Sequence, residues 1–267
     1  MWAMAGMYNR GLIIISITGR HAAAGLYSHR GNMPEFAIIL ARWAAWAPGL
    51  ESETDWAHWD GEPPQGPAVP DLSWLPPMQR RRLPALARGV FHVARQAGGD
   101  DVDRLPTVLA SAHGELSRTL GLLNDLAENE PLSPAAFSLS VHNAVSGQLS
   151  IALGNRAPAS CVALAGDGIS TALLEAQCLA GPGGDALVVI YEAPLPEQYR
   201  PYQQSDTFPW ALALRLGPGG TGYRLSRRAG SGGPANQGPA LARFLAAGDA
   251  DLTLRGPRSD WRWTRDE

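Results

Sequence analysis

Residues 158–180 read PASCVALAGDGISTALLEAQCLA, and this stretch decides the fold class. Its first half, Pro158 to Ala165, is a nearly unbroken apolar run, which is typical of a central parallel strand buried on both faces. Gly166 breaks the run. The second half, from Gly168 to Ala180, predicts a helix because apolar residues recur at helical spacing along it. The residues that face inward in this helix are Ile169, Leu173 and Ala176.

Segments on both sides of this unit extend the same alternation of strand and helix. Apolar runs predict three further buried strands, at residues 35–50, 105–112 and 185–191. Helical spacing of leucine, valine and alanine predicts three further helices, at residues 78–97, 115–128 and 142–154. Pro84 has to lie in the first turn of the first of these helices or mark its true start. Strands that alternate with helices indicate an α/β fold with a mostly parallel sheet and helices on both faces.

The pattern changes near the two ends of the chain. Phe208–Leu216 and Tyr223–Arg228 flank a glycine-rich loop and predict a C-terminal β-hairpin. Residues 229–267 read as a glycine-rich linker, a short helix and a charged tail that carries Trp261 and Trp263. Residues 1–32 are expected to be a poorly structured extension, with a signal peptide as the weaker alternative. The patterned domain therefore spans residues 33–228.

Composition excludes several classes of protein. The 267 residues contain 22 Lys+Arg and 25 Asp+Glu, and this balance argues against a binder of nucleic acid or anionic membranes. A hydrophobic content of 45% supports a buried core. No apolar run reaches the roughly 18 residues that span a bilayer. Two cysteines cannot form a disulfide framework or a cysteine-rich zinc site, which favours a reducing, cytoplasmic compartment.

Four segments in order resemble the N-terminal half of a β-ketoacyl synthase of the thiolase-like fold. They are MQRRRLPALARGVFHVARQA, LPTVLASAHGE, SPAAFSLSVHNAVSGQLSIALGNRAP and CVALAGDGISTALLEAQ. The likeness covers roughly residues 35–195, and the 208–228 hairpin is a weaker fifth match. The chain looks most similar to short ketosynthase-like proteins described as chain-length factors in aryl-polyene-type pigment pathways. The resemblance implies one half of a two-half architecture that depends on a partner to cover what remains exposed.

The resemblance also places the nucleophile, and this chain departs from the pattern there. A ketosynthase carries a cysteine where the strand meets the helix N-terminus, because unpaired N–H groups there favour a thiolate. Aligned on that unit, this chain has Gly166 at the nucleophile position and Asp167 after it. The two histidines that complete a ketosynthase site come from the other half of the family fold, and His142 is the last histidine here. No catalytic residue is therefore assigned.

Two residues remain as alternative reactive groups. Cys161 lies inside the predicted strand, and its odd separation from Gly166 points it to the opposite face, so a small buried hydrophobic role is expected. His113 follows a strand, where loops often hold function, although helix capping or surface exposure explains it better.

Other residues are assigned to contacts rather than to chemistry. His142, Asn143 and Gly147 belong to the segment that the family uses near its dimer interface and acyl pocket, and simple packing is the equal alternative. Arg80, Arg81 and Arg82 are either a solvated face or a docking site for an acidic acyl carrier protein. No metal-ligand spacing occurs, and no cofactor is expected.

Three functions follow from these observations. The leading hypothesis is a non-catalytic, chain-length-factor-type subunit that pairs with a complete β-ketoacyl synthase in fatty-acid-like or polyketide synthesis. The alternative is a divergent acyltransferase acting on acyl-carrier-protein thioesters through Cys161 or His113. The third is a scaffold that binds carrier protein without shaping product length.

Overall fold

The computed structural model describes residues 35–164, 168–203, 208–232 and 237–266. All of them belong to the compact unit Met33–Glu267. The expected extension at residues 1–32 lies outside the described residues, as do Gly166 and Asp167.

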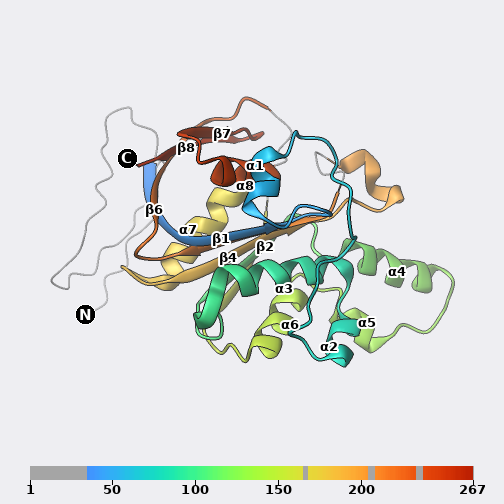
Figure 1. Ribbon diagram of the computed structural model, residues 1–267. Coiled ribbons are helices and arrows are strands. Elements are labelled where there is room, and N and C mark those ends of the chain that lie inside the picture. Colours follow the sequence, from blue (N-terminus) through green and yellow to red (C-terminus); the bar gives the residue numbers. More distant parts are fainter. Residues whose placement is uncertain (1–34, 165–167, 204–207, 233–236, 267) are drawn as a thin grey trace, which may run out of the picture. The chain divides into compact units, whose positions relative to one another are not determined.

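Eight described strands form one sheet in the order β3-β2-β4-β5-β1-β6-β8-β7 (Figure 1). Their bounds are β1 Glu35–Trp46, β2 Thr107–Ser111, β3 Ala159–Ala163, β4 Ala186–Glu192, β5 Trp210–Leu216, β6 Thr221–Ala229, β7 Asp251–Leu254 and β8 Ser259–Arg265. The sheet is mixed rather than mostly parallel as expected. Parallel pairing is confined to β3, β2 and β4, and every other described pair is antiparallel. The α/β class is nevertheless confirmed, because strands and helices alternate through much of the chain.

The expectation of a central strand at residues 158–165 is wrong, because β3 is an edge strand. It pairs with β2 in register from Thr107–Ala159 to Ser111–Ala163, and no described strand pairs with its other side. All five of its residues are half-buried or exposed. An apolar strand at an open edge is a template for pairing with another chain.

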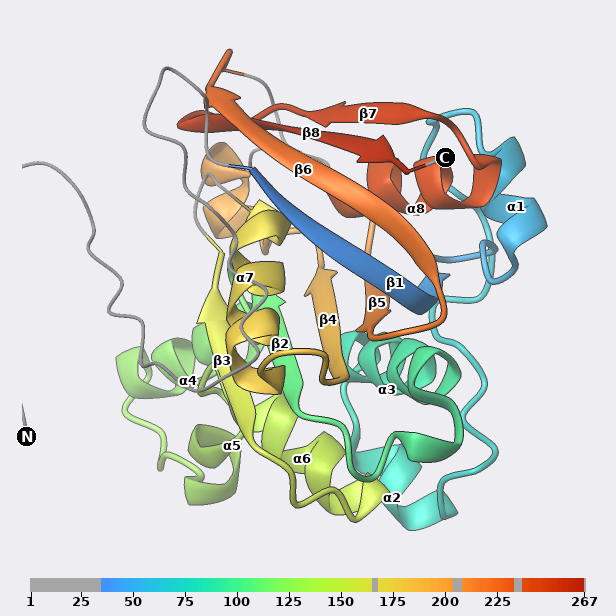
Figure 2. The same cartoon turned by 90° about the vertical axis from the view of Figure 1, so that its left-hand side faces the viewer.

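The expected hairpin of residues 208–228 is also not formed, since β1 lies between β5 and β6 (Figure 2). The loop between these two strands passes over β1, where the amide N–H of Gly217 donates to the carbonyl of Ile39 at 3.1 Å. Gly220 lies so close to the backbone of Leu40 that a side chain there would clash. The hairpin that ends the chain is instead β7–β8. Trp261 and Trp263 of β8 are buried in the core, not in a loose tail.

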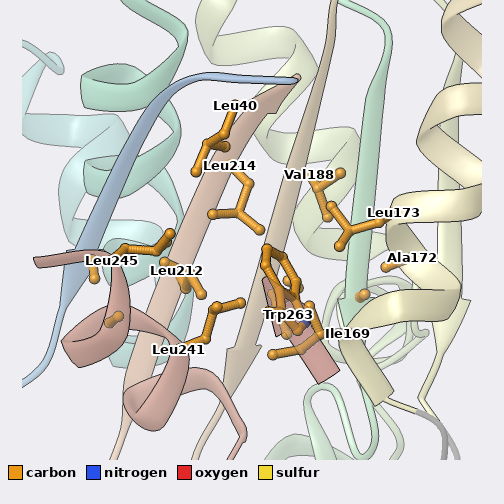
Figure 3. Close-up of a cluster of buried hydrophobic side chains, with 14 of the residues drawn as sticks. Leu40, Ile169, Ala172, Leu173, Val188, Leu212, Leu214, Leu241, Leu245 and Trp263 are labelled. Carbon is orange, nitrogen blue, oxygen red and sulfur yellow. The ribbon is translucent and has the colours of Figure 1, made fainter. Parts of the chain in front are cut away.

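Helices cover both faces of the sheet, as expected. The described helices are α1 Glu53–His58, α2 Pro77–Arg82, α3 Ala85–Gly98, α4 Leu116–Ala127, α5 Pro134–Ser138, α6 Ala144–Leu153, α7 Gly168–Ala180 and α8 Gln237–Ala247, with 3₁₀ turns at Gly99–Asp101 and Glu197–Tyr202. One apolar cluster packs α3 and α6 on the sheet. The other packs α7 and α8 on the opposite face and includes Leu173, Leu241 and Trp263 of β8 (Figure 3).

Pro84 divides the helix expected over residues 78–97 into α2 and α3. A proline disfavours helical backbone in the residue before it, and Leu83 is accordingly extended with ψ 128°. The guanidinium of Arg88 then braces the junction by donating to the carbonyls of Arg80 and Leu83 at 3.0 and 3.3 Å. The last turn of α2, with its three arginines, is thereby held against the start of α3.

Candidate functional site

The candidate site lies at the carboxyl ends of the parallel strands. β2 ends at Ser111, β3 at Ala163 and β4 at Glu192. Because the three strands are parallel, these carboxyl ends lie together at the same end of the sheet. Ligand sites of open α/β sheets form outside the carboxyl ends of the strands. The segment 165–167, which contains the expected nucleophile position, follows β3 and lies outside the described residues.

The turn between β2 and α4 is fixed by two side chains. The hydroxyl of Ser111 accepts from the backbone N–H groups of His113 and Gly114 at 3.3 and 2.7 Å. The carboxylate of Glu192, a buried residue, accepts from the N–H of Ala112. Gly114 has φ +54°, a left-handed conformation that favours glycine, so the sharp turn requires this residue type.

A cleft of about 200 Å³ opens beside this turn. The start of α3, the β2–α4 turn and the segment after β4 form its walls. The lining residues are Pro84, Ala85, Leu86, His113, Gly114, Glu115, Leu116, Ser117, Ala193, Pro194, Leu195 and Pro196. Most of these are apolar, and the polar side chains among them are His113, Glu115 and Ser117.

Burial favours the neutral form of both ionisable groups in the cleft. It lowers the pKa of His113, although part of the ring is exposed. Burial also raises the pKa of Glu115, and the nearby Arg118 only partly opposes this. Oε1 of Glu115 is buried and accepts no hydrogen bond within the described part of the chain. The cleft is therefore suited to an apolar group rather than to an anion.

His142 joins the cleft to the edge of the sheet. Its Nε2 lies 3.2 Å from the carbonyl oxygen of Val162 on β3. On its other side, the ring packs closely against Gly114 of the β2–α4 turn. Of the predicted pocket or interface residues, the structure thus brings His142 together with both the cleft and β3.

Asn143 and Gly147 lie on an exposed surface. Asn143 is the N-cap residue of α6, and its side chain makes no capping hydrogen bond. Gly147 has nothing within 4 Å of the position that a Cβ would take. Packing within the chain was the alternative to an interface role, and no described residue of this chain packs at Gly147. The interface assignment of these residues therefore stays a prediction that requires another molecule.

The structure gives Cys161 no features of a nucleophile. The residue lies in the middle of β3, and its side chain packs on the cluster that contains α6. Burial raises the pKa of the Cys161 thiol, an effect that a hydrogen bond with Ser146 only partly opposes. A raised pKa lowers the fraction of reactive thiolate. His113, the other alternative, lines the cleft about which the site is built.

Arg80, Arg81 and Arg82 form the last turn of α2, two residues before the cleft begins at Pro84. Arg81 and Arg82 are exposed and Arg80 is half-buried. None of the three makes an ion pair with any residue that the structure describes. Their charges are therefore not paired within the described part of the chain, on a helix that ends just before the cleft-lining Pro84.

A broad apolar surface lies next to the open edge of β3. Helices α4 and α5 contain no buried residue, although α4 carries the leucine stripe that sequence predicted. The large exposed apolar side chains of α4, α5, α6 and their connections are Leu123, Leu126, Leu132, Phe137, Val141 and Ile151. Ile151 is 81% exposed and Phe137 is 63% exposed. Contiguous exposed apolar surface of this kind marks a protein–protein contact.

Two residues of the site were missed by sequence reasoning. Glu192 ends the apolar run of β4, and an acid at the carboxyl end of a buried strand is a signal that could have found it. Gln237, at the start of α8, is buried against Gly168 at the start of α7 and donates to the carbonyl of Arg255 at 3.2 Å. No local pattern marks Gln237, because the contact joins residues far apart in the chain.

Residues 55–264 match the family described as "Beta-ketoacyl synthase, N-terminal domain", which is well over half of the chain. The chain belongs to this family. No curated protein matches the chain. Among the residues that the structure describes, no group of His, Cys, Asp and Glu could hold a metal ion. Within the same ranges, no helix is both long enough and apolar enough to cross a membrane.

This ketosynthase-like chain is also similar to solved structures of related proteins. It is similar to a chain in "Ketosynthase (ApeO) in Complex with its Chain Length Factor (ApeC) from Xenorhabdus doucetiae", with 26% identity and a TM-score of 0.75. The match covers 86% of this chain and 100% of that one. It is also similar to a chain of "The ishigamide ketosynthase/chain length factor", with 16% identity, a TM-score of 0.56 and coverage of 79% and 73%. The ketosynthase-like assignment and the thiolase-like fold are thereby confirmed.

Proposed function

We propose that this chain is a non-catalytic subunit of the chain-length-factor kind that pairs with a complete β-ketoacyl synthase. The observation that carries the proposal is the match, over the full length of that chain, to a ketosynthase–chain length factor complex. Gly166 at the aligned nucleophile position supports a non-catalytic role, because glycine has no nucleophile to offer. The raised pKa of Cys161 supports it further, since the sequence-based alternative of an acyltransferase needs a reactive thiolate.

The pairing surface in this proposal is the open edge of β3 together with α4, α5 and α6. No described strand pairs with the outer edge of β3, and apolar side chains such as Phe137 and Ile151 are exposed on the neighbouring helices. A partner strand added to β3 would satisfy its free backbone groups, and a partner surface would bury the apolar side chains. His142, Asn143 and Gly147 lie on or beside this surface and are proposed as interface residues.

The proposed role of the pair is to limit acyl chain growth in fatty-acid-like or polyketide synthesis of the aryl-polyene type. The chain would act in the cytoplasm, where the free thiols of Cys161 and Cys178 stay reduced. An acidic acyl carrier protein would dock on Arg80, Arg81 and Arg82, whose unpaired charges flank the cleft. No cofactor takes part in this proposal.

Co-expression tests the pairing directly. A tagged ketosynthase encoded beside this chain is captured, and the proposal expects this chain to co-purify with it in equal amounts. Failure to co-purify overturns the proposal. Products are then compared with and without this subunit: a changed acyl chain length supports chain-length control, whereas unchanged length with intact pairing assigns a scaffold role.

Carrier-protein thioesters test for catalysis. The purified chain is incubated with acyl-carrier-protein thioesters and its intact mass is measured. We expect no acyl adduct. An adduct that disappears in Cys161→Ser would assign the acyltransferase function instead.

A further inference from the structure

Helices α4 and α5 form an arm that extends from the body of the domain (Figures 1 and 2). The arm spans residues 116–138, and each helix packs mainly against the other. None of its residues is buried. A 12-residue helix such as α4 is marginal in water without packing of its apolar face. The arm therefore requires packing against another surface to be stable.

The tip of the arm carries three acidic residues. Asp125 lies in the last turn of α4, and Glu128 and Glu130 follow the helix in the connection to α5. Asn129, between the two glutamates, has φ +58°, and this left-handed residue ends the helix with a bond from the N–H of Glu130 to the carbonyl of Asp125 at 2.8 Å. The turn is thus held by backbone bonds and does not use the acidic side chains.

These three carboxylates lack partners in the described part of the chain. No ion pair joins Asp125, Glu128 or Glu130 to an arginine there. They lie in sequence beside the exposed Leu123, Leu126 and Leu132. An apolar centre with charges at its border is the usual anatomy of a protein–protein interface.

We infer that this acidic border selects a partner whose facing surface is basic and disfavours pairing with a second copy of this chain. The inference rests on the proposed function, because it specifies which partner the pairing surface accepts. Complementary charge at the rim of an interface raises the association rate, and like charges facing each other suppress the wrong partner.

The same surface of a second copy carries too few positive charges to pair with Asp125, Glu128 and Glu130. The part of the chain that includes the arm, α6 and β3, residues 115–164, holds four acids and two arginines. One of the two, Arg118, acts on the carboxyl of Glu115 within its own chain. Only Arg156 then remains to face three carboxylates. A homodimer through this surface would therefore bring together two acidic borders.

Salt-dependent capture tests the inference. Tagged ketosynthase from the neighbouring gene is co-expressed with the wild-type chain or with the triple variant Asp125→Asn, Glu128→Gln, Glu130→Gln. The fraction of chain retained is measured as NaCl rises. The matched control is Glu51→Gln, Glu53→Gln, Glu62→Gln, which removes the same charge from exposed positions before and around α1.

The inference expects about tenfold lower retention of the triple variant at low salt, with a flatter dependence on NaCl, and no change for the control. It also expects tagged and untagged copies of the wild-type chain not to co-purify with each other. Equal retention of wild type and triple variant, with normal pairing, overturns this inference alone, as does stable self-pairing of the wild type. Absence of any complex with the wild type overturns the proposed function as well.

Discussion

Nε2 of His142 lies 3.2 Å from the carbonyl oxygen of Val162. Because a carbonyl oxygen only accepts, Nε2 carries the proton and donates. The same ring rests against Gly114, whose backbone forms the turn at the cleft. One imidazole thus connects the edge strand β3 to the turn that lines the cleft, so a shift of β3 has a direct physical route to the cleft.

Replacing His142 should weaken partner binding more than it weakens the fold. His142→Ala loses one hydrogen bond, which contributes about 1 kcal/mol to the free energy of unfolding, and it frees the orientation of β3. His58→Ala is the matched control, because His58 also bonds to a single carbonyl, that of Thr54. We expect similar melting temperatures for the two variants and reduced capture by the ketosynthase for His142→Ala only. Equal capture of both would contradict this role for His142.

A proline at Ala163 should block pairing while it preserves the fold. Backbone bonds join β2 to alternate residues of β3: the N–H of Thr107 donates to Pro158, and the N–H of Leu164 donates to Ser111. By this alternation the N–H of Ala163 faces the open edge, where proline is tolerated. We expect Ala163→Pro to melt within a few degrees of wild type and to fail in ketosynthase capture. In Val162→Pro, the control, the missing N–H faces β2, and that variant should melt much lower.

A charge at Ile151 should abolish pairing without cost to the isolated chain. Ile151 is 81% exposed on α6, so Ile151→Asp removes no packing within this chain. At a partner surface the same carboxylate would be desolvated, and we expect affinity to fall at least about tenfold. Met78→Asp, at a residue that is 69% exposed on α2, makes the same kind of change away from the proposed surface. Both variants should keep the wild-type melting temperature, and only Ile151→Asp should lose capture.

The two cysteines should differ in reactivity. Burial raises the pKa of Cys161, whereas Cys178 on α7 is exposed. Treatment of the folded chain with iodoacetamide near pH 8 should alkylate Cys178 well before Cys161, as measured by peptide mass mapping. The rates should converge in denaturant. Faster modification of Cys161 in the folded chain would point to an activated thiolate and reopen the acyltransferase hypothesis.

Glu115 should make stability depend on pH. Because burial raises its folded-state pKa, its contribution to stability is present below the unfolded pKa and is lost as pH rises through the folded one. Glu115→Gln should therefore raise the melting temperature relative to wild type at pH 7, and the difference should vanish near pH 4. Glu128→Gln, which makes the same change at an exposed residue, is the matched control. A Glu115→Gln effect that is the same at both pH values would contradict this assignment.

Local patterns in the sequence were sufficient to predict most helices and strands, but they did not predict which strands pair with one another. Helix α7 and strand β4 were predicted because apolar spacing directly reports a buried face. The position of β1 between β5 and β6 could not be predicted, since it depends on pairing between residues far apart in the chain. The glycine loop indicated a hairpin, which is the commonest local solution. In β8 the alternation of Trp261, Arg262 and Trp263 is typical of a strand, but the charged residues around it made the segment resemble a solvated tail.

At the candidate site, too, the sequence did not reveal which residues far apart in the chain come into contact. The apolar run of β3 predicted burial on both faces, but a sequence does not say whether the covering atoms belong to the same chain. The leucine stripe of α4 likewise predicted a buried face that this chain does not cover. The contacts of Glu192 with Ala112 and of His142 with Val162 join residues far apart in the chain, and no local motif encodes them.

The place of β1 in the sheet also sets the order of events during synthesis. The first described strand, Glu35–Trp46, pairs only with β5 and β6, which begin at Trp210 and Thr221. On the ribosome, the apolar residues of β1 therefore have no strand partner until more than 160 further residues have been synthesised. Such delayed long-range pairing slows folding and exposes aggregation-prone strands. The sheet can therefore be completed around β1 only after residues 210–229 have been synthesised.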